Sequence, residues 1–242
     1  MSKHQNNSIK KRRIFSEEEL RDFSKGFMEL ALEGIDSGDL EKAKYWCRRE
    51  AETHDALHDT FVDTVTALLS FIYDKLGEET AVYVLREVMA RQLHTPELIA
   101  QRKQMGLAEK VRWLADVWRQ QATNPGLTVE EDDEKFTITV KCGSGAKLIE
   151  KGAYEGPNGF RRLKKAGPHS WGEVNLPIYC GHCPQAHEIL PIETVGQGAQ
   201  FWIHVSPFPK NPGDPCIHLI YKNPKDIPNK YYQRLGLEKI RT

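Results

Sequence analysis

Apolar residues recur at helical spacing through the first half of the chain. The series begins with Leu20, Phe23, Phe27, Leu30 and Leu32, and Ser16 with three glutamates precedes it. Serine caps a helix N-terminus, and acidic residues favour its first turn. The pattern therefore predicts one helix that begins after Ser16 and ends before Gly38.

A longer helix is predicted from Leu40 to Leu76, with Gly77 as its C-cap. Its apolar stripe consists of Leu57, Phe61, Val65, Leu68 and Ile72. Further helices are predicted for Glu78 to Leu93, after Thr95-Pro96, and for Leu107 to Gln121, the last with Val111, Leu114 and Trp118 on one face. The short connections favour an antiparallel bundle.

The pattern changes at Asn124-Pro125-Gly126. Beyond this turn, alternating β-branched residues predict a hairpin from Leu127 to Val140, and strands are expected at Phe201 to Val205 and Ile217 to Tyr221. Prolines make Pro207 to Pro215 a loop. The expected fold class is α+β: an N-terminal antiparallel helical bundle (14–123) packed on a C-terminal antiparallel sheet domain with a cysteine-rich metal site (127–242).

Composition is that of an ordinary water-soluble chain. Of 242 residues, 39% are hydrophobic and 28% charged, and the formal net charge is zero. A balanced charge gives no general attraction to nucleic acid or to a membrane surface. The basic run Lys10 to Arg13 lies in a tail, residues 1–13, that we expect to be disordered. The absence of a signal-like apolar segment indicates a cytoplasmic protein, and the helical region offers a surface for a homo-oligomer.

Cysteines carry the strongest chemical signal. Cys180-Gly181-His182-Cys183 is a chelating unit, and Cys142 and Cys216 are the candidates that complete a four-ligand zinc site. Disulfides and an iron-sulfur cluster are the alternatives, although neither the inferred compartment nor the cysteine spacing favours them. Cys47 is expected to be an unliganded core residue.

Other residues could line a site near this metal. Gly143, Ser144 and Gly145 follow Cys142 and form either an anion cradle or a purely structural turn. Tyr179 and Trp171 are candidate aromatic walls, and Trp202 is a further one. His182 is expected behind the ligands or facing a substrate, and Glu188 is a candidate general base, with Glu193 as a second.

His54 and His58 lie four residues apart on one face of the long predicted helix, one turn after Glu50. This pair predicts either a functional histidine stripe, which could bind metal or supply a base, or a solvated face, because Asp55, Asp59 and Asp63 run beside it. We keep His54 and His58 as catalytic candidates.

The cysteine series resembles a known family. Cys142, the segment Pro177-x-Tyr179-Cys180-x-His182-Cys183, and Gly213-Asp214-x-Cys216 look like the pattern of the L-2-amino-thiazoline-4-carboxylic acid hydrolase family. In outline the chain is also similar to 4-vinyl reductase-like small-molecule-binding domains. The first resemblance implies hydrolysis of a small ring with a C=N bond, and we carry over only the four cysteines, because Cys142 to Gly145 and Ser170-Trp171-Gly172 depart from that pattern.

Two functions of different classes follow from these residues. The first is a zinc-binding hydrolase of a small organic molecule, such as a C=N heterocycle or a small acid, in which a thiolate or metal-polarised water attacks an electrophilic carbon. The alternative is a zinc-stapled module that senses a small ligand without catalysis, because a zinc ion held by four cysteines has no open position.

Overall fold

The structure is a computed structural model that describes residues 14–122, 124 and 126–240. It combines helices with antiparallel sheet. Contacts divide the chain into two compact units, Met1–Thr53 and His54–Thr242. Helices α4 to α6 thus belong to the same unit as the sheet, and the division into 14–123 and 127–242 stays a prediction, as does the helical bundle. The predicted disordered tail, 1–13, lies outside the described residues.

The first unit contains α1 (Glu17–Asp22), α2 (Phe27–Asp36) and the start of α3 (Leu40–Leu76). Ser16 caps α1 in a reciprocal pair with Glu19, as its sequence indicated. The single helix predicted before Gly38 is wrong, because Gly26 is extended (φ −72°, ψ 153°) and begins α2. Ser24 also donates its hydroxyl to the Arg21 carbonyl (2.7 Å), a local bond that competes with continued helix.

The predicted helix Leu40 to Leu76 is confirmed as α3, and Gly77 ends it with φ +89°. It is followed by α4 (Glu78–Leu93), α5 (Pro96–Gln104) and α6 (Leu107–Arg119). Thr95 caps α5 through its side chain, and Pro96 occupies the first turn. Cys47 in α3 is exposed, which contradicts its expected place in the core.

The main sheet is antiparallel in the order β1-β2-β6-β5. It is built from β1 (Thr128–Glu131), β2 (Lys135–Val140), β6 (Cys216–Tyr221) and β5 (Ile203–His204), so the predicted hairpin is confirmed. The strand expected at Phe201 to Val205 has only two residues in the ladder. Pro207 to Pro215 contains neither helix nor strand, as predicted.

The remaining elements are short. They are α7 (Gly145–Glu150), β3 (Arg162–Leu163), η1 (Pro168–Ser170), β4 (Leu176–Pro177), η2 (Ile178–Gly181), η3 (Pro184–Ile189), α8 (Leu190–Val195), η4 (Pro224–Asp226) and α9 (Lys230–Gln233). Strands β3 and β4 form a separate antiparallel pair. The η3 segment is a π-helix, which is rare and frequently marks a functional site.

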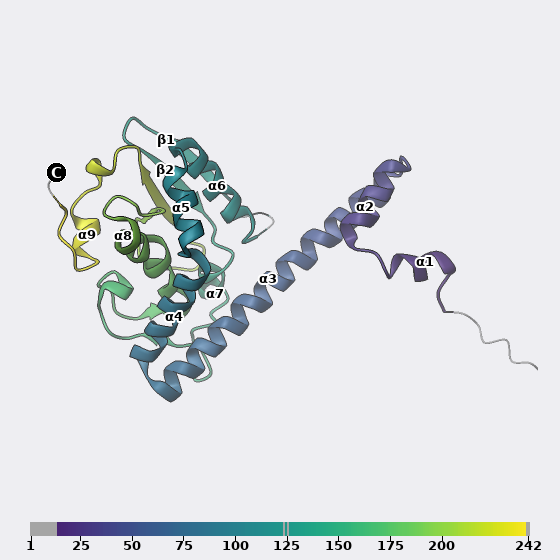
Figure 1. Cartoon of the computed structure of the whole chain (residues 1–242). Coiled ribbons are helices and arrows are strands. Elements are labelled where there is room, and N and C mark those ends of the chain that lie inside the picture. Colours follow the sequence, from purple (N-terminus) through teal and green to yellow (C-terminus); the bar gives the residue numbers. More distant parts are fainter. Residues whose placement is uncertain (1–13, 123, 125, 241–242) are drawn as a thin grey trace, which may run out of the picture. The chain divides into compact units, whose positions relative to one another are not determined.

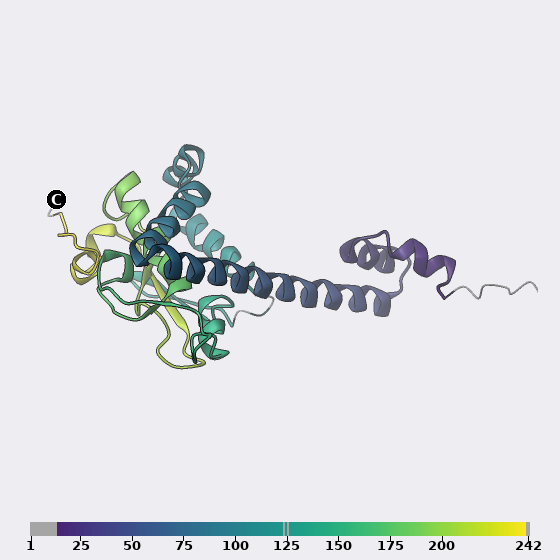
Figure 2. The same cartoon turned by 90° about the horizontal axis from the view of Figure 1, so that it is seen from below.

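Three apolar clusters hold the second unit together. Leu114 and Trp118 of α6 pack with Ile138 of β2 and Ile220 of β6. Ile192 of α8 shares a second cluster with the tyrosines of α9, and in both views the yellow C-terminal segment lies beside the green segment that contains α8 (Figure 1, Figure 2). The third cluster joins the C-terminal half of α3 and α4 to α7, β3 and β4. The candidate site lies where segments from these clusters meet.

Candidate metal centre and its cavity

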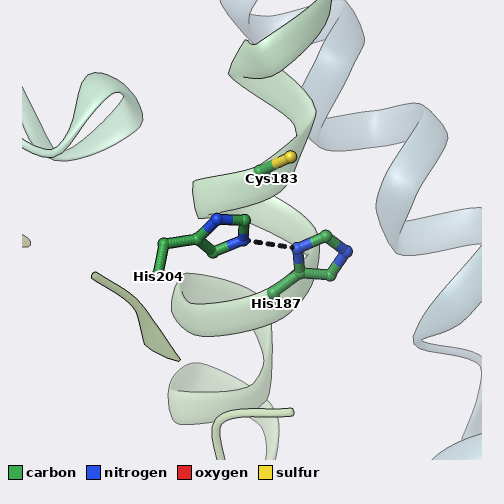
Figure 3. Close-up of side chains that lie close together, drawn as sticks. All are labelled: Cys183, His187 and His204. Carbon is green, nitrogen blue, oxygen red and sulfur yellow. Dashed lines mark hydrogen bonds between the residues drawn. The ribbon is translucent and has the colours of Figure 1, made fainter. Parts of the chain in front are cut away.

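Cys183, His187 and His204 each bring one ligand atom into a group whose atoms all lie within 4.8 Å of one another. Cys183 caps the π-helix η3, His187 lies four residues later on it, and His204 comes from strand β5. Figure 3 shows the two imidazole edges facing each other, with Cys183 on the same helix as His187. This group of one thiol and two imidazoles could hold a metal ion.

The spacing of the two imidazoles fits a tetrahedral ion. Nδ1 of His187 and Nε2 of His204 lie 3.1 Å apart. Two zinc ligands at about 2.0–2.1 Å in tetrahedral geometry are separated by about 3.3 Å. The two nitrogens therefore need only a small shift to share one zinc ion.

The protonation state of the two rings also fits a metal. Burial, and then neighbouring histidines, hold the pKa values of His187 and His204 well below the ordinary value, so both rings are neutral at neutral pH. Trp202 Nε1 donates to His204 Nε2 (2.9 Å), the atom that also faces His187 Nδ1. The single lone pair on His204 Nε2 therefore faces two donors, Trp202 Nε1 and His187 Nδ1. A bound metal ion would take the place of the proton between the two rings, and Trp202 would lose its hydrogen bond to His204.

The Cys183 thiol would lose its proton only when a metal ion binds. Burial raises the pKa of its thiol well above the ordinary value. A neutral thiol is a poor ligand, whereas metal binding releases its proton and yields the thiolate. The thiol sulfur lies 3.5 Å from Nε2 of His182.

Glu188 lies next to His187 but belongs to a buried ion pair. Its carboxylate is fully buried and accepts hydrogen bonds from Arg234 (2.7 and 2.9 Å), Trp171 Nε1 (3.0 Å) and the backbone N–H of His204 (3.1 Å). Burial raises its pKa while Arg234 opposes this shift. Three of these bonds end on Oε1 and one on Oε2, and Glu188 does not line the cavity, so the geometry favours a role in positioning β5 over that of the predicted general base.

A cavity of about 380 Å³ adjoins the metal group. Its wall is mostly apolar, supplied by α3, α4 and α6, and both Cys183 and His187 line it. Of the predicted site residues, the cavity brings together Cys142, Ser144, Gly145, Tyr179, Cys180, His182, Cys183 and Cys216. This volume suits a small organic ligand.

The four cysteines predicted to share one zinc ion all line this cavity, but their arrangement is uneven. In the part of the chain that the structure describes, they do not form a group of three or more mutually close ligand atoms. The Cys216 thiol and then the backbone N–H groups of Ala146, Ser144 and Gly145 lower the pKa of Cys142 to about 6, against the effect of burial. The four-cysteine ligand set stays a prediction.

The glycines after Cys142 provide space. Neither Gly143 nor Gly145 has a positive φ. A side chain on Gly145 would place its Cβ 2.7 Å from Sγ of Cys180, and one on Gly143 would collide with the backbone of Gln121. The small residues of this loop thus let Cys142 and Cys180 pack close together in the cavity wall. This favours a purely structural turn over an anion cradle.

His58 contacts this loop from outside the cavity. Its Nε2 lies 3.2 Å from the Ser144 hydroxyl, which donates to Oε1 of Gln121 (2.7 Å). Because the Ser144 hydroxyl uses its proton in the bond to Gln121, Nε2 of His58 donates a hydrogen bond to the Ser144 oxygen. This bond holds the loop. His54, 3.4 Å from Asp55, does not line the cavity either. The two histidines do not join the metal group in the described structure.

His182 and Tyr179 face the cavity, whereas Trp171 does not line it. Nδ1 of His182 lies 2.5 Å from the Tyr179 carbonyl, so this nitrogen carries the proton, and Nε2, which lies 3.5 Å from the Cys183 thiol, is the accepting atom. Trp171 is buried against Glu188. His182 is therefore the base-like group of the cavity wall.

The sequence interpretation did not name His187 and His204 as candidate ligands. The signal for His187 was its position four residues after Cys183, a spacing that puts two side chains on one helical face. No local pattern marks His204, because only tertiary packing brings β5 to the π-helix.

No family model matches the chain, and neither a curated protein nor a solved structure gives a match. Among the residues that the structure describes, no helix has both the length and the apolar character needed to cross a membrane.

Proposed function

We propose that the chain is a zinc-dependent hydrolase of a small organic molecule with an electrophilic C=N or C=O carbon. The observation that carries the proposal is the group of three candidate ligand residues, of which Cys183 and His187 line a 380 Å³ cavity. Three protein ligands leave a fourth position open, which is the usual arrangement of catalytic zinc. The resemblance to the L-2-amino-thiazoline-4-carboxylic acid hydrolase family supports a ring C=N bond as the bond that is attacked.

A zinc ion held by Cys183, His187 and His204 would supply Lewis acidity that polarises the C=N or C=O bond and eases deprotonation of water. His182 then accepts a proton from the attacking water at Nε2, since Nδ1 already donates to Tyr179. The new C–O bond forms as the π electrons of the C=N bond move to nitrogen. His182 returns its proton to that nitrogen, which gives the hydrated ring. His182 then takes the proton of the new hydroxyl as a C=O bond forms and the ring C–N bond breaks, and it passes this proton to the departing nitrogen, so one water is consumed and the ring opens.

The test compares zinc-loaded protein with chelator-treated protein on small C=N heterocycles, with ring opening followed by absorbance. We expect turnover that chelation removes and added zinc restores. His182→Gln should retain zinc and lower kcat by about 10²–10⁴-fold. His54→Gln, outside the cavity, is the matched control and should keep full activity. Zinc-loaded protein that binds these compounds without turnover would contradict the proposal.

That contradictory result would favour a second function, a zinc-stapled small-molecule-binding module. One observation supports it: all four cysteines line the same cavity as the two histidines His182 and His187. If the thiolates of Cys142, Cys180, Cys183 and Cys216 all bound one ion, no open position would remain for chemistry. The cavity would then hold a ligand beside a structural metal.

A further inference from the structure

A second hollow, of about 410 Å³, lies between the α5-α6 pair and the segment from α8 to Ala199. Trp113 and Phe201 line both this hollow and the cavity of the metal group. The two spaces are thus neighbours that share an aromatic wall. Their chemistry differs, because the wall of the first cavity includes cysteines and no lysine or arginine among the described residues.

The hollow is basic. Arg102, Lys103 and Lys110 line it, and none of its described lining residues is acidic. Within residues 14–122, 124 and 126–240, none of these three side chains has a carboxylate within 4.0 Å. By contrast, Arg86 nearby is ion-paired with Glu193, and Arg119 on α6 is paired with Asp116. Arg102 and Lys110 are partly buried, and such charges without a counter-ion are costly unless an anion joins them.

Arg102 and Lys110 each donate one hydrogen bond to a backbone carbonyl, which leaves their other donors unused. Arg102 lies over the ring of Phe201 at 4.0 Å and donates one N–H to the Leu93 carbonyl. Lys110 donates one of its three protons to the Gln200 carbonyl (2.7 Å). A guanidinium has five N–H donors and an ammonium has three, so several donors remain for a ligand.

Helix electrostatics explains only part of this arrangement. Arg102 and Lys103 lie in the last turn of α5, where cations favour the helix dipole. Lys110, however, lies near the N-terminus of α6, where the dipole disfavours a cation. Burial lowers the pKa of Arg102 to about 10 and that of Lys110 to about 8, which reflects the cost of holding both charges away from water.

We propose that this hollow, formed by Arg102, Lys103, Lys110 and the aromatic wall of Trp113 and Phe201, binds the carboxylate or phosphate group of a small organic anion. An arginine fork and two ammonium groups suit an oxyanion. The apolar side chains of Ile99, Met105 and Pro191, which also line the hollow, offer contacts to the rest of the ligand. This site does not depend on the metal or on hydrolysis.

The experiment titrates the full chain, with and without zinc, with inorganic phosphate and separately with benzoate, against chloride at equal ionic strength. Tryptophan fluorescence reports binding, because Trp113 lines the hollow. We expect saturable binding of at least one of these anions, and the two arms show whether a tetrahedral or a planar oxyanion is preferred. Lys110→Met should weaken that binding by about tenfold or more, through loss of a charge-assisted hydrogen bond.

Arg112→Gln is the matched control, since Arg112 is exposed on the same helix and does not line the hollow. It should leave the affinity unchanged. Lys103→Gln removes an exposed charge at the rim and should weaken binding less than Lys110→Met. If Lys110→Met fails to fold, weaker anion binding by Lys103→Gln than by Arg112→Gln supports the proposal, and equal binding contradicts it. The proposal is overturned if neither anion binds more tightly than chloride, or if Arg112→Gln weakens binding as much as the lining variants do.

Discussion

The two sides of the metal cavity use the same residue type with different results. On one side, Cys183 joins His187 and His204 in a group of mutually close ligand atoms. On the other side, Cys142 and Cys216 are hydrogen-bonded to each other, and Cys180 is packed against Gly145. The difference lies in the backbone, because a π-helix places Cys183 and His187 together and a strand adds His204. Cysteine spacing therefore predicts which residues meet, but not which of them share an ion.

The largest expected effect separates the two sides directly. His187→Ala and His204→Ala each remove one of the three proposed ligands, and both should lose stoichiometric zinc, measured by elemental analysis after dialysis against a weak chelator. His54→Ala is the control and should retain zinc, since His54 lies outside the group. Full zinc content in both ligand variants would show that the histidine side does not hold the ion.

A second prediction concerns the carboxylate behind the histidine side. Glu188→Ala leaves the buried Arg234 guanidinium without its partner and releases the backbone of His204. We expect a loss of about 3–5 kcal/mol in the free energy of unfolding, measured in urea. Glu193→Ala breaks the exposed pair with Arg86 and should cost less than about 1 kcal/mol. Equal small losses would show that Glu188 does not hold β5 in place.

Much of the fold could be predicted because its signals are local. Caps at Ser16 and Thr95, the stop at Gly77 and the alternation before Val140 each depend on a few neighbouring residues, and each is confirmed. The helix broken at Gly26 and the π-helix η3 were missed. Both arise from backbone geometry that apolar periodicity does not encode.

The candidate site was predictable in composition but not in roles. The tight Cys180 to Cys183 unit indicated a metal, and the cavity does collect all four predicted cysteines. Glu188 looked like a base because it follows the histidines in sequence, yet the helix turns it towards Arg234 and away from the cavity. His204 lies on another element, so its part in the group depends on tertiary packing alone.

The smallest expected effect concerns Cys142. If Cys183 is the one thiolate ligand, zinc binding near neutral pH releases one proton. Zinc affinity should then rise about tenfold per pH unit between about pH 6.5 and 8, because the burial-raised pKa keeps the Cys183 thiol protonated in the metal-free protein. The histidines add no slope, since their lowered pKa values leave them neutral in this range.

Cys142→Ser should leave both the zinc affinity, within about threefold, and this slope unchanged, whereas Cys183→Ser should lose the slope along with most of the affinity. The affinity can be measured by competition with a chromogenic chelator at several pH values. A four-cysteine site predicts another result. Cys180 and Cys216 also have raised pKa values, so their ionisation would steepen the slope to about three protons, and Cys142→Ser would weaken zinc binding strongly. The slope therefore counts the thiolates that bind the ion, and with them whether a position is left open for chemistry.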